Sequence, residues 1–107
     1  MWRLWPLQRF VVRDTSMRPA LEPGDRLVIA CWLGPRVGDV VVFRDPEDRA
    51  TFLMKRVAGV ASDGDVMVCG DNPNVSRDSR HFGAVPRGLI VGRVIYRYLP
   101  RPRRGPL

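Results

Sequence analysis

The chain contains three short turns built on the pair Gly-Asp, and each is followed at once by a run of apolar, mostly β-branched residues. The turns and their runs are Gly24-Asp25 before 26–30, Gly38-Asp39 before 40–43, and Gly64-Asp65 before 66–69. Glycine supplies the backbone freedom of a tight turn, and β-branched side chains favour a pleated strand. Two more β-rich segments lie at 52–60 and 89–98, and no segment keeps a helical apolar period over several turns. The sequence therefore predicts a mainly β fold, a single compact twisted sheet or partly closed barrel.

Length and charge restrict the domain organisation. A chain of 107 residues suits one domain with a modest core, so we expect residues 1–107 to form a single domain. The net charge is +7, but four arginines and no acid lie at 97–107. The first 96 residues hold 14 basic and 11 acidic residues, a net charge of only +3. The basicity is mostly a property of an Arg/Pro-rich tail at 99–107, which we expect to be solvated.

The apolar stretches are too short to cross a membrane. The longest, at 27–33, falls far below the roughly 20 residues that a spanning helix needs. Arg3, Pro6 and Arg9 interrupt the start, so it predicts neither a signal peptide nor an anchor. We expect residues 1–10 to form an arm or first strand packed on the domain, with peripheral contact with a membrane surface as the alternative, since Trp and Arg suit that interface.

The two cysteines give no sign of a metal site or a disulfide framework. Cys31 and Cys69 stand alone and match no ligand spacing. We expect them to be reduced thiols of the core, in a cytoplasmic protein that needs no metal and no cofactor.

Lys55 is the only lysine among 18 basic residues. An ammonium group can lose its proton near neutral pH when it is desolvated, whereas a guanidinium group cannot. Alternation along a strand puts Lys55 on the same face as Leu53 and Val57. If that face is buried, burial lowers the pKa of Lys55 toward the range of a general base. The alternative is an exposed lysine that happens to be alone, and the residues themselves leave both interpretations open.

Ser16 is the best-placed nucleophile of the four serines. It lies on a loop ahead of a strand, and Pro19 restricts Arg18 to extended geometry. A serine hydroxyl needs a nearby base, and a Ser-Lys pair is a known alternative to a Ser-His-Asp triad, which would here depend on the single histidine, His81. The other interpretation of Ser16 is an ordinary turn or cap residue.

A long polar segment at 70–86 completes a set of motifs that resembles the type I signal peptidase family. Such a segment in a small domain is usually functional or disordered. The resemblance rests on four motifs in the family's order: Ser16-Met17-Arg18-Pro19 followed by Pro23-Gly24-Asp25, then Gly38-Asp39 with 40–43, then Lys55-Arg56-Val57 with Gly59, then 70–80 with Gly83. These span residues 16–83, and the last motif beside a lone lysine is the most specific part. The family also implies a fold of the signal peptidase and LexA peptidase type.

The resemblance implies roles at the matching positions. Ser16 would attack the scissile carbonyl, and neutral Lys55 would accept its proton and return it to the leaving amine. Ser76 would orient the Lys55 amine, and Asp78 and Arg80 would form a structural ion pair beside the site. The Ser16 amide would supply part of the oxyanion hole. Pockets for small residues before the cleaved bond would be lined by Val12, Met17, Leu21, Leu53 and Met54.

The sequence departs from the family pattern at two points, which bear on the oxyanion hole and on the subgroup that the chain resembles. Asp14 stands two positions before the nucleophile, where the family often has a hydroxyl residue or glycine. Because a carboxylate there would oppose a developing oxyanion, we expect Asp14 to point away. We also expect a protein without the family's membrane anchor and second domain. A minimal chain of this kind resembles the nickel-type superoxide dismutase maturation proteases, as do residues 78–83 and the Arg/Pro-rich end, which implies removal of an N-terminal leader from a precursor protein.

Other functions fit the sequence less well. A LexA-type self-cleaving repressor needs a DNA-binding domain, and only 15 residues precede Ser16. A small basic β-barrel that binds nucleic acid would interleave basic and aromatic residues on one face, whereas the arginines here are scattered, so we expect no nucleic-acid partner. A general signal peptidase, or an inactive module spoiled by Asp14, stays open as an alternative.

Overall fold

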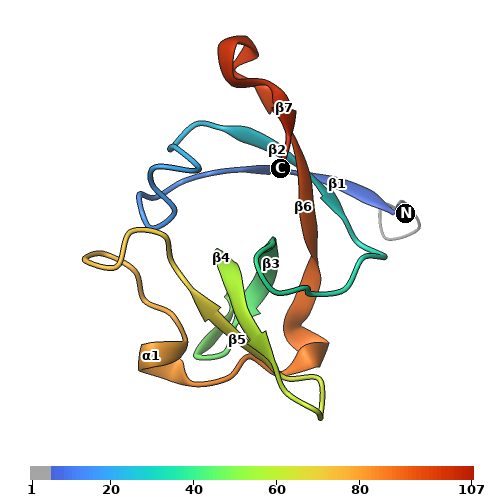
Figure 1. The fold of residues 1–107 in the computed structure, drawn as a ribbon, viewed down its shortest axis with the longest axis vertical. Coiled ribbons are helices and arrows are strands. Elements are labelled where there is room, and N and C mark those ends of the chain that lie inside the picture. The colour runs from blue at the N-terminus through green and yellow to red at the C-terminus, as the bar shows by residue number, and fades with distance from the viewer. Residues whose placement is uncertain (1–5) are drawn as a thin grey trace.

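The computed structural model describes residues 6–107, which form one antiparallel sheet of seven strands (Figure 1). The strands are β1 (Leu7–Val11), β2 (Arg26–Ala30), β3 (Val40–Asp45), β4 (Asp48–Val60), β5 (Val66–Cys69), β6 (Ile90–Leu99) and β7 (Gly105–Pro106). One short helix, α1 (Ser79–Phe82), and two 3₁₀ turns, η2 (Arg87–Leu89) and η3 (Arg101–Arg103), complete this part of the chain. The order across the sheet is β1-β2-β6-β3-β4-β5, with β7 paired to β6. The predicted mainly β fold is confirmed, and the sheet is open because β1 and β5 lie at its opposite ends.

Glycine makes the turns that set the strands apart. Gly24, Gly38 and Gly64 have φ angles of 93°, 92° and 93°, a backbone conformation that residues with a Cβ rarely adopt. Each lies just ahead of the strand that the sequence predicted after it. The turn chemistry therefore accounts for where β2, β3 and β5 begin.

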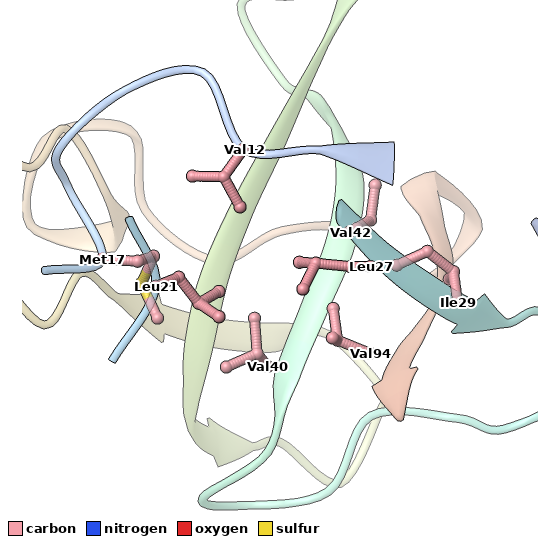
Figure 2. Packing of buried hydrophobic residues seen from close by; sticks show 8 residues of the cluster. All are labelled: Val12, Met17, Leu21, Leu27, Ile29, Val40, Val42 and Val94. Atoms are coloured by element: carbon pink, nitrogen blue, oxygen red, sulfur yellow. The ribbon is translucent and has the colours of Figure 1, made fainter. Parts of the chain in front are cut away.

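The core lies on both faces of β3, the strand with four consecutive buried residues, Val40–Phe43. On one face, Val40 and Val42 pack with residues from β1, β2, β6 and the loop that follows β1 (Figure 2). On the other face, Val41 and Phe43 pack with residues of β4, β5 and the segment before β6. A strand that is buried on both faces has apolar residues at successive positions, which explains why apolar and polar residues do not alternate in β3.

The fold brings two distant loops together. The loop between β1 and β2 holds Ser16, and the segment between β5 and α1 holds residues 70–78; both lie on the same side of the sheet (Figure 1). The Asn72 amide donates a hydrogen bond to the Ser16 carbonyl oxygen at 2.9 Å. This contact joins the two polar loops that the sequence marked as irregular.

The two chain ends differ in part from the sequence expectations. Residues 7–10 belong to β1, in line with the expected first strand. The alternative, a membrane contact through Trp and Arg at the start of the chain, concerns residues 1–5, which lie outside the described residues. The C-terminal segment is not simply a solvated tail. Arg103 donates to Asp25 at 2.7 Å, and Asp25 is only 2% exposed. An ion pair to a buried carboxylate and the pairing of β7 with β6 hold this segment on the domain.

Candidate active site

Ser16 lies on a loop that the core holds in place. The neighbouring side chains of Met17 and Leu21 are buried in the cluster of Figure 2. Backbone hydrogen bonds from Arg18 to Thr15 and from Leu21 to Met17 shape the loop as two successive turns. Ser16 itself is 4% exposed, so its hydroxyl is fixed within the protein rather than free in solvent.

Lys55 reaches Ser16 from β4, 39 residues further along the chain. Its Nζ donates to Ser16 Oγ at 2.7 Å, and the residue is 2% exposed. The alternation of β4 places Lys55 on the same face as Val57, and both side chains are buried. Of the two interpretations that the sequence left open, the structure therefore has the buried lysine. Burial lowers the pKa of Lys55, although the negative charges of Asp14 and Asp78 act in the opposite direction. An amine in this environment gives up its proton more readily than an exposed lysine.

Residues 70–72 hold the Ser16 loop from the other side. Besides the backbone bond to Ser16, the Asn72 side-chain amide donates to the Thr15 carbonyl oxygen at 3.1 Å. Gly70 allows close packing, because a Cβ at this position would lie 2.8 Å from the Ser16 carbonyl oxygen and would overlap Ser76 Oγ. Residues 70–72 therefore support the serine loop.

A buried carboxylate organises the rest of this segment. Asp78 is fully buried and accepts hydrogen bonds from Arg80 Nε and Nη2, both at 2.9 Å, which is the ion pair that the family resemblance implied. It also accepts from the Gly70 amide and from Ser76 Oγ, each at 2.9 Å. Burial alone would raise the pKa of Asp78, but these hydrogen bonds outweigh it and hold the pKa well below its usual range. The charged carboxylate thus stabilises the loop.

The structure differs from the expected role of Ser76 at this carboxylate and gives His81 a place there too. Ser76 is 5% exposed and lies beside Gly70, but its hydroxyl donates to Asp78, and no hydrogen bond joins it to Lys55 within the described residues. His81 makes no hydrogen bond to Ser16 among residues 6–107; its Nδ1 accepts from the Asp78 amide as part of the N-terminal cap of α1. The histidine therefore has a structural role, and the described residues form no Ser-His-Asp triad.

Asp14 does not point away from the nucleophile, so that expectation is wrong. Its Oδ1 accepts from the Ser16 amide at 3.0 Å and from Ser16 Oγ at 2.8 Å. The reason is local: a carboxylate two residues before an amide closes an Asx turn, and here the serine hydroxyl points to the same oxygen.

A cleft of about 430 Å³ adjoins the Ser16 loop. Four of the five residues predicted to line substrate pockets lie on its wall: Val12, Met17, Leu53 and Met54. The fifth, Leu21, is 1% exposed in the core and lines a separate, smaller cavity. The sequence analysis missed other wall residues, which are Arg9, Phe10, Val11, Arg13, Asp14, Val42 and Phe52. Strand alternation puts Phe10 on the same face as Val12 and could have identified it.

The arrangement suits acyl transfer to a serine. A buried amine contacts a serine hydroxyl, and Asp14 and Met17 on either side of the serine line the cleft between the β1 and β4 segments. Among residues 6–107, no three His, Cys, Asp or Glu side chains lie close enough together to hold a metal ion. Cys31 and Cys69 are half-buried free thiols, and burial raises the pKa of Cys31.

Comparison with known proteins gives the family of the chain. The family model described as "Signal peptidase, peptidase S26" matches residues 1–64 and 61–99. The chain belongs to this signal peptidase family. It is 38% identical to mitochondrial ATP-independent inner membrane protease subunit 1b of Arabidopsis thaliana, over 86% of this chain and 70% of that protein. It is 36% identical to mitochondrial inner membrane protease subunit 1 of Schizosaccharomyces pombe, over 81% and 70%, and 30% identical to probable signal peptidase I-1 of Synechocystis, over 92% and 74%.

Membership of the signal peptidase family confirms the predicted class, a signal peptidase-like serine peptidase. It also corrects the expected location. The expectation of a cytoplasmic protein is wrong, because relatives in three organisms carry names that place them at the mitochondrial inner membrane. None of the helices in the part of the chain described here has the length and hydropathy of a membrane span.

Proposed function

We propose that this signal peptidase-like protein is an endopeptidase that uses Ser16 as nucleophile and Lys55 as general base to remove a leader from a precursor protein. The observation that carries the proposal is the buried contact of 2.7 Å between Lys55 Nζ and Ser16 Oγ. A buried lysine beside a serine hydroxyl serves no evident packing purpose, since charged side chains are rarely buried without a role. The surrounding family motifs give the pair its context.

In the proposed reaction, an extended precursor segment lies in the cleft with its scissile carbonyl carbon against Ser16 Oγ. Neutral Lys55 takes the hydroxyl proton as Oγ attacks, and the resulting ammonium returns the proton to the leaving amine. The product is an acyl-enzyme, which water hydrolyses with Lys55 again as base. The Ser16 amide donates to the oxyanion, and a well-aimed donor of this kind lowers the barrier by about 3 kcal/mol.

The proposal is tested by three substitutions in one cleavage assay. Ser16→Ala and Lys55→Ala should each abolish cleavage, and Lys55→Arg should fail as completely, because arginine keeps its proton. Ser62→Ala is the matched control, since Ser62 is exposed in a turn away from the cleft. Circular dichroism shows whether each variant stays folded. Cleavage by a folded Ser16→Ala or Lys55→Arg protein rules the dyad out.

The substrate class follows from the relatives as part of the same proposal. The related proteins are membrane proteases and a probable signal peptidase, so we place the reaction on precursors that reach a membrane. Within this class, the stretch 78–83 and the Arg/Pro-rich end favour the leader of a nickel-type superoxide dismutase. Co-expression of the chain with this precursor and with a signal-peptide precursor, followed by mass spectrometry of their N-termini, identifies which is cut. A Ser16→Ala co-expression is the control for cleavage by host enzymes.

A further inference from the structure

Asp14 occupies two groups that the proposed reaction needs free. Its Oδ1 accepts from the Ser16 amide at 3.0 Å, the donor that would stabilise an oxyanion. The same oxygen accepts from Ser16 Oγ at 2.8 Å, so the hydroxyl proton points to the carboxylate and not to Lys55. Lys55 Nζ in turn donates to Oγ, which is the reverse of the bond that a general base makes.

The electrostatics of this arrangement oppose the transition state. An oxyanion bound by the Ser16 amide would have to take the place of Asp14 Oδ1, and two negative oxygens at hydrogen-bond distance repel strongly. The Asp14 carboxylate also favours the protonated form of Lys55, which cannot act as a base.

Asp14 is free to leave this position. The residue is exposed, and within the described residues its side-chain hydrogen bonds go only to Ser16. By contrast, the fully buried Asp78 is held by Arg80, Ser76 and the Gly70 amide. A rotation of the Asp14 side chain into solvent would release both the amide and the hydroxyl of Ser16 without moving the backbone.

We infer that the Asp14 carboxylate blocks the oxyanion position in the free protein, so that cleavage requires its side chain to leave Ser16; this inference rests on the proposed role of Ser16. Asp14 therefore inhibits the proposed dyad in the free protein. The carboxylate competes with the substrate carbonyl for one amide, and only the fraction of molecules with Asp14 turned away is competent.

A purely structural role for Asp14 makes a different prediction. An Asx turn stabilises a loop, and asparagine or serine at position 14 would keep such a turn. If the turn were its only role, Asp14→Asn and Asp14→Ser would leave the site unchanged. If the charge blocks the oxyanion, both variants should bind an oxyanion more tightly, since Asn and Ser each offer a neutral hydrogen-bond donor.

The test uses a fluorescent peptide that ends in alanine boronic acid. Boron accepts a lone pair of Ser16 Oγ, a B–O bond forms, and the hydroxyl proton passes to Lys55, which leaves a tetrahedral borate anion in the oxyanion position. Fluorescence anisotropy gives the Kd without knowledge of the natural substrate. We expect Asp14→Asn and Asp14→Ser to bind about tenfold more tightly than the unmodified protein.

A matched control distinguishes the effect of unblocking the oxyanion position from the effect of removing one negative charge. Asp63→Asn removes one charge from an exposed aspartate in the same kind of turn, where Asp63 Oδ1 accepts from the Asp65 amide at 2.9 Å, and it should bind as the unmodified protein does. Unchanged or weaker binding by either Asp14 variant overturns the inference. Ser16→Ala distinguishes this failure from that of the proposed function: if Ser16→Ala binds the boronate as tightly as the unmodified protein, Ser16 is not the nucleophile.

Discussion

Gly70 packs against the backbone of Ser16 so closely that a Cβ at position 70 would lie 2.8 Å from the Ser16 carbonyl oxygen. This contact, together with the hydrogen bond from Asn72, sets the position of the serine loop. A Cβ at this position would also overlap the Ser76 side chain, whose hydroxyl can turn aside, but the Ser16 carbonyl oxygen is a backbone atom and cannot.

Gly70→Ala should therefore displace the Ser16 loop. We expect precursor cleavage to fall more than about tenfold, as small misplacements of a reacting group cost this much, and the free energy of unfolding to fall by about 2 kcal/mol, the typical cost of overpacking. Cleavage rates and urea unfolding measure the two effects. Gly88→Ala is the control, because a Cβ at Gly88 meets nothing within 4 Å. Equal rates for both variants would show that the contact does not position Ser16.

The pH dependence of cleavage should follow the protonation of Lys55. Burial lowers the pKa of Lys55, while Asp14 and Asp78 oppose the shift. Because only the neutral amine is a base, kcat/KM should rise with pH, with its midpoint below the ordinary range of lysine. Asp14→Asn removes one of the two opposing charges, so its midpoint should move to lower pH. A midpoint that is unchanged in Asp14→Asn would mean that Asp14 does not act on Lys55.

Lys55, the proposed general base, is the part of the candidate site that the sequence predicts best. Its place on the same face as Leu53 and Val57 follows from strand alternation, because burial on a strand has a period of two, whereas its proposed role came from the family resemblance. Runs of β-branched residues predicted the β-rich segments, and the glycine turns predicted where β2, β3 and β5 begin. These properties are local, so a single sequence carries them.

The contacts of Asp14 and Ser76 could not be predicted in this way. Whether Asp14 points toward Ser16 or away depends on a side-chain rotamer, and both directions suit an Asx-type loop. Ser76 had two acceptable partners, and the buried Asp78 is the one it contacts. The packing of Arg103 against Asp25 joins positions 78 residues apart, a distance over which no periodicity extends. Composition alone therefore described the C-terminal arginines as a solvated tail.

Asp78→Asn should destabilise the protein in a manner that depends on pH. The pKa of Asp78 in the folded state lies below that of the unfolded chain, so its contribution to stability is present above about pH 4 and is lost as the pH falls further. At pH 7 we expect the free energy of unfolding to fall by about 2 kcal/mol, the cost of removing a buried, hydrogen-bonded charge. Urea unfolding at pH 7 and at pH 3 should show the difference from the unmodified protein shrinking at the lower pH. The exposed Asp63→Asn is the control, and a deficit that is the same at both pH values contradicts this assignment.

Arg103→Ala should loosen the attachment of the C-terminal segment to the Ser16 loop. Asp25 is 2% exposed and accepts from Arg103 at 2.7 Å and from Arg97 at 3.2 Å, and Arg97 also donates to the Ala20 carbonyl oxygen in the Ser16 loop. Loss of one partner leaves the buried carboxylate with the weaker of its two ion pairs, so we expect the free energy of unfolding to fall by about 1 kcal/mol.

Arg104→Ala is the matched control for this change, because Arg104 is exposed and adjacent in sequence. Thermal unfolding of the two variants should differ by several degrees, since about 1 kcal/mol shifts Tm by roughly 4–8 °C in a domain of this size. Removal of residues 101–107 should cost more than Arg103→Ala, as it also deletes β7 and its pairing with β6. A truncated protein as stable as the full chain would show that the segment is a solvated tail after all.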